Sequence, residues 1–270
     1  RWLYSSSPVE TDVLDGNGNV KFRRTGYIST AFKIEYEKEL LVGIPLKEGQ
    51  VFTYFPLAHQ ESNLKFHINA PFAIDLGRTQ FDQESKSKVE NQRLINLLAK
   101  QISAMIEDLI TSGKADLRIV ELLPVSSDQI HEDLLPIRSA VIELFSTKKL
   151  ITVDDGTRVK PDEIFNAREE ICDQFDDNGI MLLNAVNNSK FSRVEPGRVS
   201  KARFILPIAK SSRMNMFMRQ IGVAEINNEK LLEFFHELNW VLRPGNLIEN
   251  KSRIATNLNS WIKARSDERI

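Results

Sequence analysis

Five residues within a β-like stretch could do chemistry together. Residues 66–81 read FHINAPFAIDLGRTQF, and the five are His67, Asn69, Asp75, Gly77 and Arg78. A strand that ends in a tight turn can hold one guanidinium at a fixed point. A fixed guanidinium stabilises phosphoryl charge better than a mobile ammonium does. The alternative is a surface arginine paired with a neighbouring aspartate, which contributes little to stability.

The other polar residues of this stretch have supporting roles in the catalytic interpretation. Gly77 supplies the tight turn that aims Arg78, and Asp75 either orients Arg78 or caps the turn. His67 and Asn69 tie the polar face of the strand to adjacent backbone, which is the usual use of such side chains. No metal site is predicted, because the chain has one cysteine and its remaining histidines lie in separate elements without ligand spacing.

A second candidate is a basic stretch at 190–204, KFSRVEPGRVSKARF, in which phenylalanines are interleaved with cations. Aromatic rings between cations are typical of surfaces that bind a nucleic-acid strand. A solvated loop is the alternative interpretation. The candidate polyanion-binding residues are Lys190, Arg193, Arg198, Lys201 and Arg203.

The composition excludes several broad classes. The 270 residues carry a formal charge of −1, so no global field favours nucleic acid or an anionic membrane. No apolar run approaches the roughly 20 residues that span a bilayer. Hydrophobic residues make up 41% of the chain, as in ordinary soluble proteins. The single cysteine favours a reducing compartment, and we expect a cytoplasmic segment of a longer chain, because it starts at Arg1 without a signal peptide.

The elements that must position these residues follow from periodicity. Residues 1–44 predict β strands, with a hairpin at VLDGNGNVKF and alternation along TGYISTAFKIEY. Glycine and proline punctuation near residue 44 predicts a domain junction. Beyond it we expect adjacent, antiparallel strands over 51–57 and 64–76 and a long helix over 84–112. That helix should cover the sheet through Leu94, Leu98, Ile102 and Met105.

The second half predicts more helix. The stretch ADLRIVELLPV reads either as a strand or as the end of a helical hairpin, and a helix follows over 127–146, kinked or restarted at Pro136. A hairpin is expected in KKLITVDDGTRVKPDEIF, and Pro161 then opens a helix. The predicted division is therefore a β segment over 1–44, an α/β domain over 45–165 and a mainly helical region over 166–270.

Three of these stretches carry a family resemblance. GQVFTYFPLAHQESNLKFHINAPFAIDLGRTQF (49–81) resembles the segment that follows the nucleotide-binding domain in sacsin and its bacterial and plant relatives. Those proteins contain an ATPase module of the GHKL type, which heat-shock chaperones share. KKLITVDDGTRVKPDEIF and FMRQIGVAEINNEKLLEFF are similar to later pieces of the same family, in the same order.

The resemblance implies an α/β (α+β) middle domain like that of the GHKL chaperone-type ATPases, followed by a mainly helical region. It also implies that Arg78 reaches the γ-phosphate of ATP bound by a preceding module of the same polypeptide. That module would hold the ATP and magnesium. The residues that bind adenine, magnesium and phosphates in such modules are not present here, so the chain alone is not expected to hydrolyse ATP.

Two functions remain open on the sequence. In the first, the segment couples nucleotide state to a chaperone-like activity on a protein client, or to a phage-defence effector. In the second, it is a non-enzymatic interaction or nucleic-acid-binding module that uses the basic 190–204 cluster.

Overall fold

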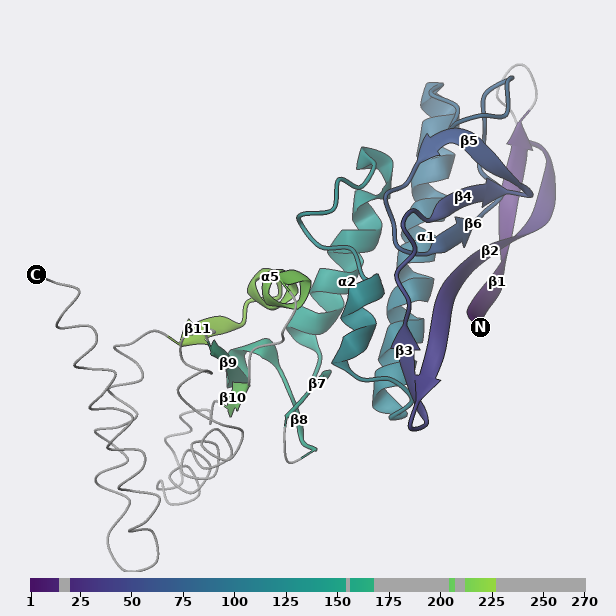
Figure 1. Ribbon diagram of the computed structural model, residues 1–270. Coiled ribbons are helices and arrows are strands. Elements are labelled where there is room, and N and C mark those ends of the chain that lie inside the picture. Colours follow the sequence, from purple (N-terminus) through teal and green to yellow (C-terminus); the bar gives the residue numbers. More distant parts are fainter. Residues whose placement is uncertain (15–19, 154–155, 168–203, 207–211, 227–270) are drawn as a thin grey trace, which may run out of the picture. The chain divides into compact units, whose positions relative to one another are not determined.

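The computed structural model describes residues 1–14, 20–153, 156–167, 204–206 and 212–226 (Figure 1). The chain divides into two compact units, Arg1–Thr152 and Val153–Ile270. Both contain strands and helices, so the predicted mixture of α and β structure is confirmed.

The first unit is built around one sheet with strand order β1-β2-β6-β4-β5, and β3 pairs with the end of β2. Its strands are β1 Trp2–Leu14, β2 Val20–Glu37, β3 Leu40–Gly43, β4 Gln50–Thr53, β5 Phe55–Glu61 and β6 His67–Asn69. The helices that follow are α1 Ser85–Thr111, the 3-10 helices Leu117–Leu122 and Glu132–Leu134, and α2 Leu135–Thr147, before the short strand β7 Ile151–Thr152.

The predicted N-terminal hairpin is confirmed as the antiparallel pair β1–β2, although its turn lies outside the described residues. Along β2 the buried side chains of Ile28, Phe32 and Ile34 alternate with exposed ones such as Tyr27. β2 also pairs with β6, so the segments 1–44 and 45–152 share one sheet and one compact unit.

The glycines near residue 44 reflect close packing inside this unit. A Cβ on Gly49 would lie 1.8 Å from the carbonyl oxygen of Phe66, and one on Gly43 would lie 2.4 Å from a side-chain carbon of Leu122. Both distances are far shorter than any contact a side chain can make. Neighbouring elements approach these two positions so closely that only glycine fits there. Gly43 and Gly49 therefore do not mark a junction between two units.

The strand predicted over 51–57 is divided at Tyr54, whose φ is +73°. The chain reverses there, so β5 runs antiparallel to β4. A second reversal after β5 brings β6 alongside β4 in the parallel direction, with Val51 opposite Ile68. The expected adjacency of the two stretches is confirmed, and their expected antiparallel orientation is wrong.

The strand predicted over 64–76 is shorter than expected, because regular pairing ends after Asn69. Pro71 has no backbone N–H to continue a ladder. Beyond it, only an isolated bridge between Ile74 and Phe81 closes the loop that carries Arg78.

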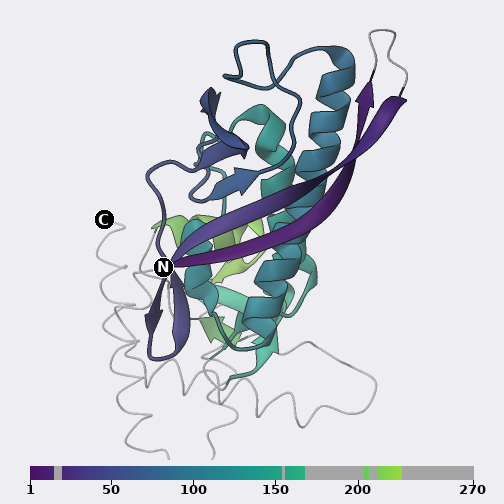
Figure 2. The ribbon, with the colours of Figure 1, turned by 90° about the vertical axis from the view of Figure 1, so that its right-hand side faces the viewer.

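The long helix is confirmed with its predicted face. Leu94, Leu98 and Ile102 are fully buried, whereas Met105 is only half-buried. The helix ends before Gly113, which has φ +72°, a conformation that glycine adopts without steric cost. Figure 2 shows α1 behind the long β1–β2 ribbon, so that one face of the sheet packs on the helix.

Two later segments of the first unit decide between structures that the sequence left open. Residues 117–122 form a 3-10 helix, neither the strand nor the regular helix considered for this stretch. Pro136 lies in the first turn of α2, where its missing N–H costs nothing, so this proline restarts a helix and does not kink one.

The second unit contains a small parallel sheet with order β10-β9-β11. The predicted hairpin is confirmed as β7 paired with β8 Arg158–Val159. The helix expected from Pro161 is wrong for the described residues: a 3-10 turn, Pro161–Glu163, leads directly into β9 Ile164–Ala167, whose Ile164 and Phe165 are buried. The remaining described elements are β10 Phe204–Leu206, α5 Ser212–Gln220 and β11 Ala224–Ile226, and most of the region predicted to be mainly helical, 166–270, lies outside the described residues.

One buried side chain joins α1 to the loop that follows β6. The Asn91 Oδ1 atom accepts the Ala73 backbone N–H at 2.8 Å, and its Nδ2 donates to the Ala73 carbonyl at 2.8 Å. Asn91 is only 4% exposed, and Ala73 is half-buried.

We predict that Asn91→Ala lowers the free energy of unfolding by about 1–3 kcal/mol, because it leaves the Ala73 N–H without its partner, whereas the Ala73 carbonyl still accepts the Asp82 N–H. Urea denaturation of the whole chain measures this. Asn96→Ala, an exposed asparagine on the same helix, is the control and should change stability by less than about 0.5 kcal/mol. Equal loss in the two variants would contradict the proposed role.

Candidate functional site

Arg78 lies in a tight turn that the Asp75 side chain caps. The Arg78 N–H donates to the Asp75 carbonyl at 3.0 Å, which closes the turn. The Asp75 carboxylate accepts the Thr79 N–H at 2.7 Å, the Thr79 hydroxyl at 2.9 Å and the Gln80 N–H at 3.3 Å. Of the two roles considered for Asp75, capping is therefore the one observed.

The turn is anchored on both sides by the fold. On one side, the His59 N–H of β5 donates to the Thr79 carbonyl at 2.9 Å, and the buried Gln60 side chain accepts the Phe81 N–H at 3.1 Å. On the other side, Asn91 of α1 holds Ala73. The loop that carries Arg78 is thus fixed to a strand and to a helix.

The residue with the unusual backbone is Arg78 itself. Its φ is +57°, a left-handed conformation that costs a residue with a Cβ roughly 1 kcal/mol. A Cβ on Gly77 would meet only ordinary contacts, the nearest 3.5 Å away at Asp75 Oδ2. Gly77 is therefore not needed to make the turn, contrary to our expectation that glycine sets its direction.

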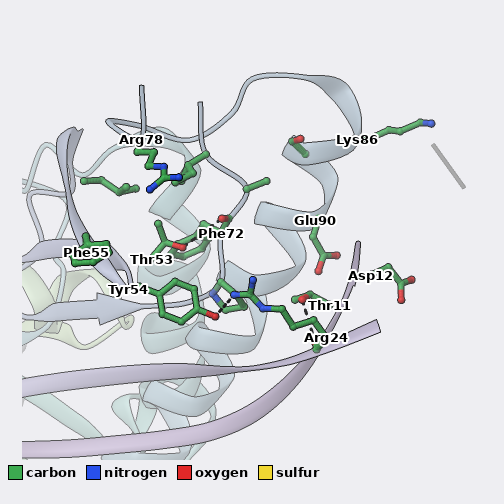
Figure 3. A pocket seen from close by; sticks show the side chains of 15 residues that line it. Thr11, Asp12, Arg24, Thr53, Tyr54, Phe55, Phe72, Arg78, Lys86 and Glu90 are labelled. Atoms are coloured by element: carbon green, nitrogen blue, oxygen red, sulfur yellow. Dashed lines mark hydrogen bonds between the residues drawn. The ribbon is translucent and has the colours of Figure 1, made fainter. Parts of the chain in front are cut away.

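A cavity of about 640 Å³ opens beside this turn (Figure 3). Its walls come from the C-terminal end of β1, the N-terminal end of β2, the reversal at Tyr54, the 71–78 loop and the N-terminal end of α1. Three cationic side chains line it: Arg24, Arg78 and Lys86. In Figure 3 the guanidinium of Arg78 extends inward from the loop, whereas Lys86 points away from the other two cations.

The two carboxylates of the cavity wall are already paired with other residues. Asp12 accepts from Arg23 Nε at 3.1 Å, and Glu90 accepts from Arg93 Nη2 at 2.7 Å. None of the three lining cations forms an ion pair with a carboxylate of the described residues. The cavity therefore presents uncompensated positive charge.

Arg24 is positioned by an aromatic ring. Its guanidinium lies 5.0 Å from the centre of the Tyr54 ring and donates a hydrogen bond to the Tyr54 hydroxyl. A cation over a ring is attracted by the ring quadrupole and keeps its charge. Tyr54 thus holds Arg24 at the cavity without neutralising it.

The N-terminal end of α1 adds to this potential. Lys86 and Ser87, in the first turn, line the cavity, and the helix has 27 residues. The dipole of a helix places partial positive charge at its N-terminus. Helix end, Arg24 and Arg78 together make a site suited to an anion such as a phosphate.

His67 and Asn69 do not line this cavity and have structural partners, as expected. His67 Nδ1 accepts the Gln50 N–H at 2.9 Å, and burial lowers the pKa of the imidazole. The Asn69 side chain accepts the Tyr54 N–H and donates to the Tyr27 carbonyl, each at 3.4 Å.

The other predicted site lies outside the described residues: Lys190, Arg193, Arg198, Lys201 and Arg203 have no described structure. Among the residues that are described, no group of three or more His, Cys, Asp or Glu side chains could hold a metal ion. Within the same ranges, no helix has the length and apolar character needed to cross a membrane.

Sequence reasoning missed Arg24, Tyr54 and Lys86. A cation in the first turn of a predicted helix is a recognisable signal for Lys86. No local signal indicated Arg24 or Tyr54, because they come together across 30 residues of chain.

Comparisons with protein-family models, with curated proteins and with solved structures find no match for this chain.

We predict that Asp75 stabilises the turn only in its ionised form. Its pKa is lowered from the ordinary 3.8, chiefly by the Thr79 N–H. A lowered folded pKa means that the stabilisation is complete above pH 3.8 and disappears as the pH falls through the lower folded value. Thermal melts of wild type and Asp75→Asn from pH 7 to pH 2 measure this.

The wild type should melt higher than Asp75→Asn at neutral pH, and the two curves should converge in acid. Glu48→Gln removes an exposed carboxylate without a partner among the described residues and controls for the change in net charge. A constant difference at every pH would contradict the role of the carboxylate.

Proposed function

We propose that this chain is the middle, transducing segment of a sacsin-like GHKL-type ATPase, and that Arg78 contacts the γ-phosphate of ATP held by the preceding module. The observation that carries the proposal is the geometry of Arg78. An unpaired guanidinium lines a cationic cavity on a turn fixed to both β5 and α1.

The chemistry of the cavity suits a polyphosphate end. Phosphoryl transfer concentrates charge on the γ-phosphate oxygens, and catalysis in this class rests on positioning and charge stabilisation. Because the turn that carries Arg78 is already fixed, only its side chain has to be ordered when the phosphate binds. Arg24, held over Tyr54, would add a second positive charge to the same cavity. Magnesium and adenine, in this proposal, are bound by the ATPase module.

The fold also offers a route for coupling. The cavity includes the first turn of α1, and α1 then runs for 27 residues, about 40 Å, and packs on α2. A phosphate that binds or leaves at the N-terminal end of α1 acts on one rigid element whose other end is far away. Through it, nucleotide state would act on a chaperone-like or defence effector activity in the cytoplasm.

We predict that Arg78→Ala lowers the ATP turnover of the complete polypeptide by roughly 10²–10³, the loss typical of removing one preorganised charge-stabilising donor. Arg78→Lys should restore only part of it, because the planar fork is lost. Nucleotide binding should survive, since its other contacts lie in the ATPase module. Steady-state ATPase assays with thermal melts measure these effects.

The Arg78→Ala variant tests the guanidinium without changing the backbone strain at this position. Arginine and alanine both carry a Cβ, so the left-handed strain at φ +57° is the same and only the guanidinium is removed. Lys88→Ala, an exposed cation of α1 that does not line the cavity, is the control and should keep full turnover. Equal turnover in wild type and Arg78→Ala, or no ATPase activity in the wild type, would overturn the proposal.

A further inference from the structure

The outer strand β1 has backbone groups without partners along residues 2–6. In the described sheet β1 stands at one end of the strand order and pairs only with β2. Its Arg1 forms two backbone hydrogen bonds with Ile34. In an antiparallel ladder the next residue, and every second one after it, then points its N–H and C=O away from the neighbouring strand. Within the described residues, the outward backbone groups of Trp2, Tyr4 and Ser6 have no hydrogen-bond partner.

A cavity of about 650 Å³ lies between this part of β1 and the C-terminal half of α1, and its size is typical of ligand sites. The β1 residues that face α1 here are Leu3, Ser5 and Ser7, and all three line the cavity. Because two of them are serines, the strand does not cover the helix. On α1, Met105 is therefore only half-buried, and Ala104 is exposed.

The cavity opens at the free edge of β1. Tyr4 belongs to the opposite face of the strand, where its hydroxyl donates to Ser29 at 2.9 Å, yet it also lines the cavity. On the inner side, Gln101 of α1 donates to the Ser7 hydroxyl at 2.9 Å and ties the helix to the strand. A chain laid along this edge would meet unpaired backbone groups beside it and a recess on its α1 side.

The charges around the cavity are balanced. Asp108 and Glu39 contribute two carboxylates to the lining, and Lys114 contributes one ammonium. A second cation, Arg1, lies over the ring of Tyr36, another lining residue, 5.6 Å from the ring centre. The other lining residues are apolar or neutral. With no net charge to attract a polyanion or a polycation, the cavity is complementary to an uncharged occupant.

An extended peptide would fit both the edge and the cavity. Side chains of a strand point alternately to its two faces, so peptide residues opposite Leu3 and Ser5 would enter the cavity, and the residue opposite Tyr4 would not. Antiparallel pairing opposite Tyr4 satisfies both its N–H and its C=O. In recognition by strand addition, the main-chain hydrogen bonds supply affinity, and pockets for alternate side chains supply specificity.

We propose that β1 and α1 form a binding site for an extended, uncharged peptide segment of a partner protein. The segment adds to the sheet as an antiparallel strand along residues 2–6 and places two apolar side chains, two residues apart, in the cavity. This cavity shares no lining residue with the cationic cavity that contains Arg78, so the site is independent of the ATPase role proposed above.

The test is fluorescence anisotropy of a labelled peptide, Gly-Thr-Leu-Thr-Leu-Thr-Gly, titrated with the whole chain. The central threonine should pair with Tyr4, and the leucines should enter the cavity. N-methylation of the central threonine removes the N–H that donates to the Tyr4 carbonyl, so it should weaken binding roughly 5- to 100-fold. N-methylation of the second leucine adds the same methyl group to an N–H that points away from β1, and this peptide should bind as the unmodified one does.

Two pairs of protein variants test the edge and the cavity separately. Ser6→Pro removes one edge N–H and should weaken binding about 3- to 10-fold, whereas Ser6→Ala keeps the N–H and should bind as wild type does. Proline is tolerated where the N–H of an edge strand faces solvent, as at Pro8 of the same strand. Ala104→Glu places a charge in the cavity and should weaken binding at least about tenfold. Asn96→Glu adds the same charge to α1 outside the cavity and should bind as wild type does.

Several results would overturn the proposal. Equal binding of the two methylated peptides, or equal affinity of Ser6→Pro and Ser6→Ala, would exclude strand addition. Equal affinity of Ala104→Glu and Asn96→Glu would exclude the cavity. No binding of the unmodified peptide would also overturn it, and sedimentation would then show whether a second copy of this chain takes the edge. Each variant should keep the ATPase turnover of the complete polypeptide, so failure here and failure of the Arg78 role are distinguishable.

Discussion

The link between the helix α1 and the loop that carries the candidate site is one pair of hydrogen bonds, between the Asn91 side chain and the backbone of Ala73. The chain between β6 and α1 has little regular structure beyond the Ile74–Phe81 bridge, and Asn91 ties its Ala73 backbone to the helix. Asn91 satisfies a donor and an acceptor of that segment inside the protein, where unpaired groups are costly. The loop, the first turn of α1 and the cavity between them are thereby fixed as one piece.

Features that depend on many residues in sequence were predictable. The 27-residue helix α1 repeats its apolar pattern over several turns, so no single residue decides its position. The hairpin of β1 and β2 is equally clear, because alternation and turn residues agree. By contrast, the reversal at Tyr54 is a left-handed backbone at a residue that gives no such signal, and it inverted the orientation we assigned to the following strand.

The candidate site shows the same division between local and distant information. Asp75 and Arg78 belong to one short turn, and their residue types indicated both the cap and the presented cation. The glycine between them misled us, since glycine suggests a left-handed turn and the left-handed residue is Arg78. Arg24 reaches the same cavity from a distant strand, and its neutral partner Tyr54 leaves no charge pattern in the sequence. Only the three-dimensional pairing of β2 with β6 brings them together.

The outer strand β1 has a consequence for self-association. Arg1 and Ile34 exchange both of their backbone hydrogen bonds, so the alternating antiparallel pattern turns the backbone groups of Trp2, Tyr4, Ser6, Pro8 and Glu10 toward the free edge. Pro8 has no N–H to offer there, and the Glu10 carbonyl already accepts a hydrogen bond from Arg93 at 2.7 Å. A long, regular edge is a template for adding strands from other copies of a protein, and it leads to aggregation. In this chain Pro8 and the Arg93–Glu10 hydrogen bond interrupt the row of free backbone groups along β1. Edge-to-edge polymerisation is therefore disfavoured although the strand keeps its full length.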